Sequence, residues 1–149
     1  MIRNIQAQIK QLDKSIEKLL DGIPNTLQTI PGIGPVYCAG ILSEIGDILR
    51  FPGQASIAKY AGLTWRKSQS GQFEAEDTHM IRSGNRYLRY YLVEAANSVK
   101  RRETEFRDYY LKKYQHKRAL VLTARKLVRL VDALLRNDQI YTPRRKVNK

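Results

Sequence analysis

The sequence predicts a mainly α-helical protein with a helix-hairpin-helix motif, a small β-hairpin insert and an N-terminal coiled-coil helix. Three observations lead to this fold class. Apolar residues recur every three or four positions over residues 2–19, two closely spaced glycines lie within residues 30–36, and helical periodicity stops at Leu63 and resumes at Arg86. The 149 residues suffice for one compact unit plus an extended helix.

The N-terminal helix has the spacing of a coiled-coil seam. The seam residues are Ile2, Ile5, Ile9, Leu12, Ile16 and Leu19. Isoleucine in one set of positions and mostly leucine in the other favours two parallel strands, so we expect a homodimer through residues 2–19. Packing of the seam on the chain's own body is the alternative, because fewer than three full heptads are present. Asp21, Gly22 and Pro24 are expected to end the helix.

A glycine-rich turn follows, with the sequence I-P-G-I-G-P-V. Gly32 and Gly34 permit a tight turn, and Pro35 opens a helix expected over residues 35–45, whose first amide N–H groups point outward at a positive N-terminus. This resembles a helix-hairpin-helix motif, here residues 23–46, which holds a DNA phosphate without reading bases. An ordinary turn between helices is the alternative. Cys38, the only cysteine, is expected in the core or a groove rather than as a nucleophile.

Further helices are expected over residues 54–60, 86–100, 103–115 and 117–136. The helix at 103–115 carries a stripe of aromatic residues beside basic ones, which either packs in the core or stacks on bases. Between the helices expected over residues 54–60 and 86–100, Leu63-Thr64-Trp65 and Gln72-Phe73 flank Ser70-Gly71 as two short strands flank a turn. This segment is the predicted β-hairpin insert.

The charge indicates a polyanion partner. Lys and Arg total 27 against 14 Asp and Glu, a formal charge of +13, and residues 100–149 alone hold 16 basic and 5 acidic residues. The alternative without a partner is that the charges only solvate exposed helix faces. An anionic membrane surface is a less favoured partner, because no basic helix has a bulky aromatic face for lipid. No apolar run approaches the length of a membrane span, and we expect a cytoplasmic protein.

Ser70 is the candidate nucleophile, although a serine on a glycine turn is usually structural. A serine hydroxyl needs a base, a metal or a strong positive field to attack, and nearby cations could supply that field for a phosphoryl transition state. These cations are Arg66, Lys67, Arg82, Arg86 and Arg89. The carboxylates Glu74, Glu76 and Asp77 and the isolated His79 and His116 lack the spacing of a known metal site, so no metal is expected in this chain. Assistance in metal binding or the positioning of a base is the alternative role for the three carboxylates.

Several ordered motifs together resemble one family. They are I-P-G-I-G-P-V, F-P-G-Q-A-S-I-A-K-Y-A-G-L, Q-S-G and I-R-S-G-N-R-Y-L-R-Y-Y-L-V-E-A-A. Over residues 27–96 the chain is similar to the C-terminal transposase domain of the bacterial insertion-sequence family "IS one-ten", which comprises DEDD-type transposases guided by a bridge RNA. The match is looser in the helices beyond.

The resemblance implies site-specific DNA recombination in which Ser70 attacks a DNA phosphodiester. Gly84, Asn85 and Arg89 fall in the family's G-N-x-x-L-R segment, and with Gly71 they are expected to shape the site. The expected nucleic-acid contacts are Gly32, Gly34, Arg66, Lys67, Arg82 and Arg86. DNA and a guide RNA are the implied partners.

The resemblance also implies a division of the chain and a departure from the family. Residues 1–21 would form the coiled-coil helix, 22–137 the transposase domain and 138–149 a basic, disordered tail. Family members have an N-terminal RuvC-like domain whose four acidic residues bind magnesium, and this chain lacks it, so we expect a fragment that is inactive alone and holds no cofactor. A non-enzymatic nucleic-acid-binding and dimerisation module and a pure oligomerisation domain are the alternative functions.

Overall fold

The computed structural model describes residues 1–65, 69–70, 73–74, 80, 83–115 and 118–144. Its elements are α1 (Ile2–Asp21), the 3-10 helix η1 (Leu27–Thr29), α2 (Pro35–Ile45), the 3-10 helix η2 (Ile48–Arg50), α3 (Gln54–Tyr60), β1 (Gln69–Ser70), β2 (Phe73–Glu74), α4 (Arg86–Arg102), α5 (Thr104–Lys112) and α6 (Ala119–Asn137). The chain is mainly helical, as predicted, and the four helices expected up to residue 100 are present.

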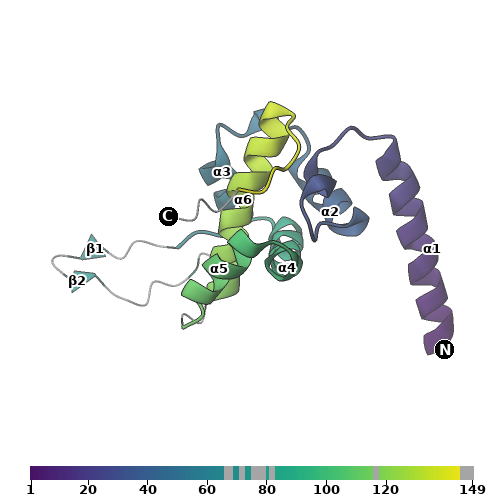
Figure 1. Ribbon diagram of the computed structural model, residues 1–149, viewed down its shortest axis with the longest axis horizontal. Coiled ribbons are helices and arrows are strands. Elements are labelled where there is room, and N and C mark those ends of the chain that lie inside the picture. The colour runs from purple at the N-terminus through teal and green to yellow at the C-terminus, as the bar shows by residue number, and fades with distance from the viewer. Residues whose placement is uncertain (66–68, 71–72, 75–79, 81–82, 116–117, 145–149) are drawn as a thin grey trace.

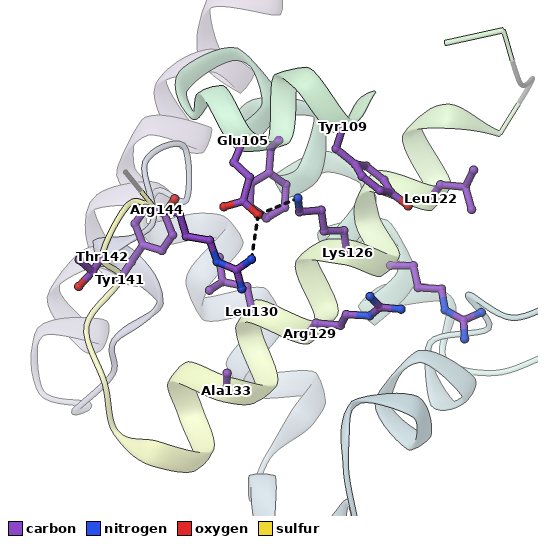
Figure 2. A pocket seen from close by; sticks show the side chains of 12 residues that line it. Glu105, Tyr109, Leu122, Lys126, Arg129, Leu130, Ala133, Tyr141, Thr142 and Arg144 are labelled. Carbon is purple, nitrogen blue, oxygen red and sulfur yellow. Dashed lines mark ion pairs between the residues drawn. The ribbon is translucent and has the colours of Figure 1, made fainter. Parts of the chain in front are cut away.

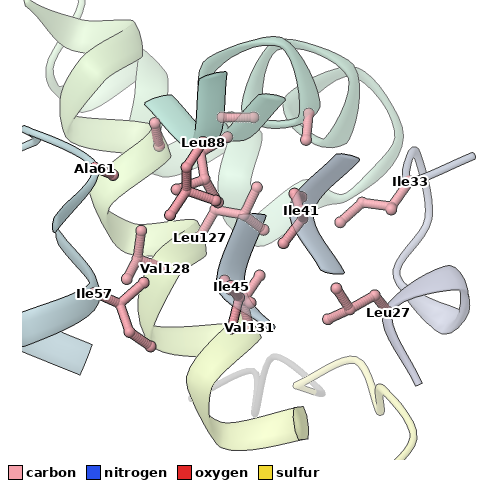
Figure 3. Packing of buried hydrophobic residues seen from close by; sticks show 14 of the residues in the cluster. Leu27, Ile33, Ile41, Ile45, Ile57, Ala61, Leu88, Leu127, Val128 and Val131 are labelled. Carbon is pink, nitrogen blue, oxygen red and sulfur yellow. The ribbon is translucent and has the colours of Figure 1, made fainter. Parts of the chain in front are cut away.

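Helix α4 is the centre of the helical body (Figure 1). It packs against α2, α5 and α6, while α3 packs against α6. Apolar residues at helical spacing on α4 are buried, and they are Leu88, Leu92, Ala95, Ala96 and Val99. Figure 3 shows the core between α2 and α6. Ile41 and Ile45 of α2 and Leu127 and Val131 of α6 lie in it, and all four are fully buried.

Helix α1 lies along one side of the body and contacts α2 (Figure 1). Leu20 at its end is its buried residue, whereas most of the predicted seam faces outward. Ile2, Ile5, Ile9, Leu12 and Leu19 are between 48% and 73% exposed. A helix is therefore present over Ile2–Asp21, and most of its apolar seam is an exposed stripe, while Ile16 is half-buried.

The β-hairpin insert is not seen in its predicted form. Leu63 is fully buried, and its N–H donates to the carbonyl of Ala58 at 2.8 Å, so it closes α3 instead of starting a strand. The described strands are β1 and β2, two residues each, which pair antiparallel with Ser70 opposite Phe73. The sequence predicts a strand here because a short apolar run has the same sequence pattern at the buried end of a helix as in a strand.

The segment after α6 lies against the body through backbone contacts. The N–H of Tyr141 donates to the Thr29 hydroxyl at 2.8 Å, and the N–H of Gln139 donates to the carbonyl of Leu134 at 3.1 Å. Asp138 at the end of α6 adopts a left-handed conformation with φ of 49°, which turns the chain back. The described part of the predicted tail thus crosses η1, 112 residues earlier in the chain.

Candidate functional site

Ser70 lies in an insert, residues 66–82, that connects α3 to α4. The backbone of Trp65 pairs with that of Met80, so the two ends of the insert meet as it leaves and rejoins the body. Strands β1 and β2 lie away from the helical body (Figure 1). The predicted site residues Arg66, Lys67, Gly71 and Arg82 fall outside the described residues. Ser70 is placed only by its backbone, opposite Phe73.

Asn85 fixes the point where the chain returns from the insert to α4. Its side-chain oxygen accepts hydrogen bonds from the N–H groups of Tyr87 and Leu88, at 2.9 and 3.0 Å, which caps α4. Its side-chain N–H₂ donates to Glu44 at 2.7 Å and to the Tyr60 hydroxyl at 3.2 Å. The amide of Asn85 thus joins α2, α3 and α4 at the base of the insert.

Gly84 brings the chain into direct contact with the end of α3. Its φ of 119° lies in the region that favours glycine, and an added Cβ would stand 2.6 Å from the carbonyl oxygen of Tyr60 and 2.9 Å from the nitrogen of Gly62. This approach lets the Asn85 N–H donate to the Tyr60 carbonyl at 2.7 Å. We call Glu44, Tyr60, Gly84 and Asn85 the clasp, because they hold together the two chain segments that flank the insert.

Hydrogen bonds at the clasp make the Tyr60 hydroxyl more acidic. Hydrogen bonds from Asn85 and Arg50 lower the pKa of Tyr60 below its ordinary value. The Arg50 guanidinium lies 5.0 Å from the centre of the Tyr60 ring and 4.8 Å from that of Phe51. Glu44, Tyr60 and Arg50 were missed from the sequence, since Glu44 is 41 residues and Tyr60 25 residues from Asn85 and no motif links them.

The two arginines at the start of α4 have different environments. Arg89 is half-buried and donates to the carbonyl of Ala61 at 3.3 Å, so it stabilises the C-terminal end of α3. Arg86 is exposed, donates to the Tyr87 hydroxyl at 2.8 Å and lies 4.9 Å from the centre of that ring. Arg89 therefore contacts the body, whereas Arg86 presents a cation and an aromatic ring together at the surface.

We predict that Asn85→Ala lowers the free energy of unfolding by about 2 kcal/mol, because it removes a helix cap and leaves Glu44 without its donor. Asn85→Ser is the matched control, since serine keeps the cap but cannot reach Glu44, and it should cost about half as much. Urea unfolding followed by circular dichroism measures both variants. Equal stability of Asn85→Ala and the wild type would contradict the role given to the clasp.

The glycine-rich turn serves packing and leaves a groove beside it. Gly32 has φ of 103°, and an added Cβ would stand 2.9 Å from backbone atoms of Ser98 and Val99, so Gly32 lets the turn touch α4. Gly34 has open space around its Cα and precedes α2, which begins with Pro35. A groove of about 420 Å³ runs along residues 32–37 and is also lined by Arg102. The groove is thus lined both by the first residues of α2 and by a cation.

The remaining chemical candidates are weaker. The Cys38 side chain is fully buried, its Sγ lies 3.1 Å from the Asn25 side-chain oxygen, and burial raises its pKa to about 11, so the thiol is protonated at neutral pH. Among the described residues, no three His, Cys, Asp or Glu side chains gather as metal ligands. His79, His116, Glu76 and Asp77 lie outside that part of the chain. No helix among the described residues is long and apolar enough to cross a membrane.

Comparisons with known proteins point to one group. The model of the family "Transposase IS116/IS110/IS902 family" matches residues 25–111. A 44.8 kDa protein of insertion element IS116 from Streptomyces clavuligerus is 30% identical over 145 residues, which cover 93% of this chain and 36% of that protein. A pilin gene-inverting protein of Moraxella bovis is 29% identical over 154 residues, 96% of this chain and 48% of that protein. The chain thus spans between about a third and a half of these relatives.

Proposed function

The chain belongs to the IS116/IS110/IS902 transposase family, and from that membership we propose that it is the DNA-binding catalytic part of an insertion-sequence transposase. In this proposal the Ser70 hydroxyl attacks a DNA phosphodiester. Relatives named as transposases and as a pilin gene-inverting protein support a role in DNA recombination. The observation that carries the proposal is the clasp, which anchors to the helical body the insert that bears Ser70.

The proposed step is a transesterification. The Ser70 hydroxyl gives up its proton as the Oγ–phosphorus bond forms, and the bond from phosphorus to one deoxyribose oxygen breaks. That oxygen takes up a proton and leaves as a hydroxyl, so one phosphodiester is exchanged for another in the protein–DNA link. Arg66, Lys67, Arg82 and Arg86, close to Ser70 in sequence or at the base of the insert, would stabilise the charge on the phosphoryl oxygens. The described residues do not fit a magnesium site. We propose that magnesium is bound by a RuvC-like domain of the complete protein.

We propose that the glycine-rich turn is a helix-hairpin-helix that holds a DNA phosphate. The first-turn N–H groups of Val36 and Tyr37 have no partner within the helix, and Arg102 lines the same groove. The contact is to the backbone and therefore independent of sequence. Gly32 packs against α4 and so fixes the position of the turn. In this proposal the phosphate is bound by the backbone N–H groups that follow Gly34.

Salt dependence tests the nucleic-acid half of the proposal. We expect the chain to bind duplex DNA with a steep negative slope of log affinity against log salt, and Arg102→Gln to reduce that slope by about one. Fluorescence anisotropy with a labelled duplex measures both. Lys59→Gln, which removes an exposed cation from α3, is the control and should keep the wild-type slope. A steep negative slope would count against a pure oligomerisation domain, whereas no detectable binding would favour it. A guide RNA would compete for the same basic surface.

We further propose that α1 pairs two copies of the chain. Its exposed stripe continues into an apolar groove of about 520 Å³ lined by Ile16, Leu19 and Ile23 together with Leu42 of α2. Leu12→Glu puts a charge into the seam and should weaken the dimer by about two orders of magnitude. Sedimentation equilibrium measures this. Gln11→Glu, the same charge outside the seam, should leave the dimer intact, and a monomeric wild type would refute the pairing.

The main alternative is a non-enzymatic module that holds nucleic acid through the turn and the basic helices. It shares the binding and dimerisation results above but predicts that no covalent link to DNA forms. A serine-linked protein–DNA adduct therefore separates the two functions.

A further inference from the structure

A pocket of about 370 Å³ lies between α5, α6 and the segment that follows α6, and the proposed function makes no use of it (Figure 2). It is formed by α5, α6 and the segment 141–144. Its size is in the range of sites that enclose a small ligand or one unit of a polymer.

The pocket is strongly cationic. Arg125, Lys126, Arg129 and Arg144 line it, against the single carboxylate of Glu105. Glu105 is engaged by Lys126 at 2.8 Å and more loosely by Arg144 at 4.0 Å. Arg129 is exposed and has no ion-pair or hydrogen-bond partner among the described residues. The pocket thus keeps an excess of positive charge that one carboxylate does not neutralise.

The other lining groups are flat or apolar. The Lys126 Nζ lies 4.9 Å from the centre of the Tyr109 ring, and Leu122 and Leu130 line the same space. Burial raises the pKa of the Tyr141 hydroxyl, which therefore stays protonated. A ligand that combines an anionic group with a planar, partly apolar one would match these walls.

The pocket also connects to the base of the insert. Arg125 donates to the carbonyl of Leu63 at 3.4 Å and lies 5.6 Å from the centre of the Trp65 ring, the last described residue before the insert. One arginine therefore belongs both to the pocket wall and to the point where the insert leaves the body.

We propose that this pocket takes one unpaired nucleotide of a nucleic-acid strand. Arg129 and Lys126 bind its phosphate, and its base lies against Tyr109 with Leu122 and Leu130 beside it. An unpaired nucleotide fits because the base must separate from its neighbours to enter a pocket of this size. The proposal rests on the proposed nucleic-acid function and adds a preference for an unpaired strand at a defined place.

Anisotropy titrations of the full chain test this with labelled single strands of about 12 nucleotides, a typical site size for such binders. Oligo-dT and oligo-rU strands distinguish DNA from RNA as the source of the nucleotide, and a duplex of the same length is the reference. We expect Arg129→Gln and Tyr109→Leu each to weaken single-strand binding about tenfold, with duplex binding changed less than about twofold. Lys59→Gln should behave as the wild type.

Glu105→Gln is expected to strengthen single-strand binding, whereas Arg129→Gln and Tyr109→Leu are expected to weaken it. It removes the carboxylate that occupies Lys126 and Arg144, so single-strand binding should tighten about threefold. Photocrosslinking of 5-iodouracil strands to the wild type, read by mass spectrometry, should label the peptide that contains Tyr109. Adducts confined to other peptides would overturn the proposal, whatever the variants do to stability.

The failures of the two proposals are distinguishable. If the wild type binds neither duplex nor single strands, the proposed function itself is wrong. If the wild type binds duplex DNA with a steep salt slope but the pocket variants bind single strands as tightly as Lys59→Gln, only the pocket proposal is overturned.

Discussion

Ser70→Ala in the complete transposase is expected to abolish strand exchange while leaving DNA affinity within about twofold of the wild type. The change removes the one oxygen that is proposed to attack phosphorus, and no neighbouring water can replace a covalent intermediate that must hold the DNA end. Binding survives because the proposed phosphate contacts lie elsewhere, at the turn before α2 and at Arg102 beside it. A plasmid recombination assay and an anisotropy titration measure the two effects.

The matched control is Ser68→Ala, a second serine in the same insert. It should recombine at a rate close to the wild type, which separates loss of the nucleophile from damage to the insert. Recombination by Ser70→Ala at the wild-type rate would show that Ser70 is not the nucleophile. Equal loss in both variants would show that the insert, and not its Ser70 hydroxyl, is required.

Gly84→Ala is expected to give the largest loss of stability, about 3 kcal/mol. Its Cβ would stand 2.6 Å from the Tyr60 carbonyl oxygen, and the φ of 119° strains any residue with a side chain. Relief requires the chain to move away from α3, which breaks the hydrogen bond from Asn85 to that carbonyl. Denaturant unfolding measures the loss, and we expect recombination to fall with it.

Gly34→Ala is the control for this effect. Nothing lies within 4 Å of its added Cβ, and its φ of −83° suits alanine, so it should cost less than about 1 kcal/mol. If Gly84→Ala were as stable as Gly34→Ala, the close approach at the clasp would not be a constraint on the insert.

The helices were predictable because each has a local signal. Asn85 is a capping residue before an apolar run, Pro35 opens α2, and Gly22 follows α1, so their ends could be placed within a residue or two. Leu63 forms no strand: it is fully buried, its N–H donates to the Ala58 carbonyl and its own carbonyl accepts from Arg125 of α6, contacts that no local pattern records. The aromatic stripe predicted for the helix at 103–115 is divided between core and surface, since Phe106 is buried and Tyr114 is exposed.

The site was predictable only in part. Gly84 and Asn85 were singled out through the resemblance, and the structure shows a physical reason for each, a close approach to α3 and a cap joined to α2. Glu44 and Arg50 could not be found, since their roles depend on how α2 and α3 meet. Arg89 donates to the Ala61 carbonyl, a contact that the sequence does not predict. The pocket of Arg129 and Tyr109 joins two helices that the sequence treats separately.

The central claim is that Ser70 forms a covalent bond with DNA. The most direct measurement incubates the complete, magnesium-supplied protein with a suicide DNA substrate, in which the cleaved end cannot rejoin, and analyses the product by denaturing electrophoresis and mass spectrometry. The account predicts a protein–DNA adduct linked through Ser70 that is absent in Ser70→Ala and present in Ser68→Ala. A protein that binds and recombines DNA without any serine-linked adduct would contradict it.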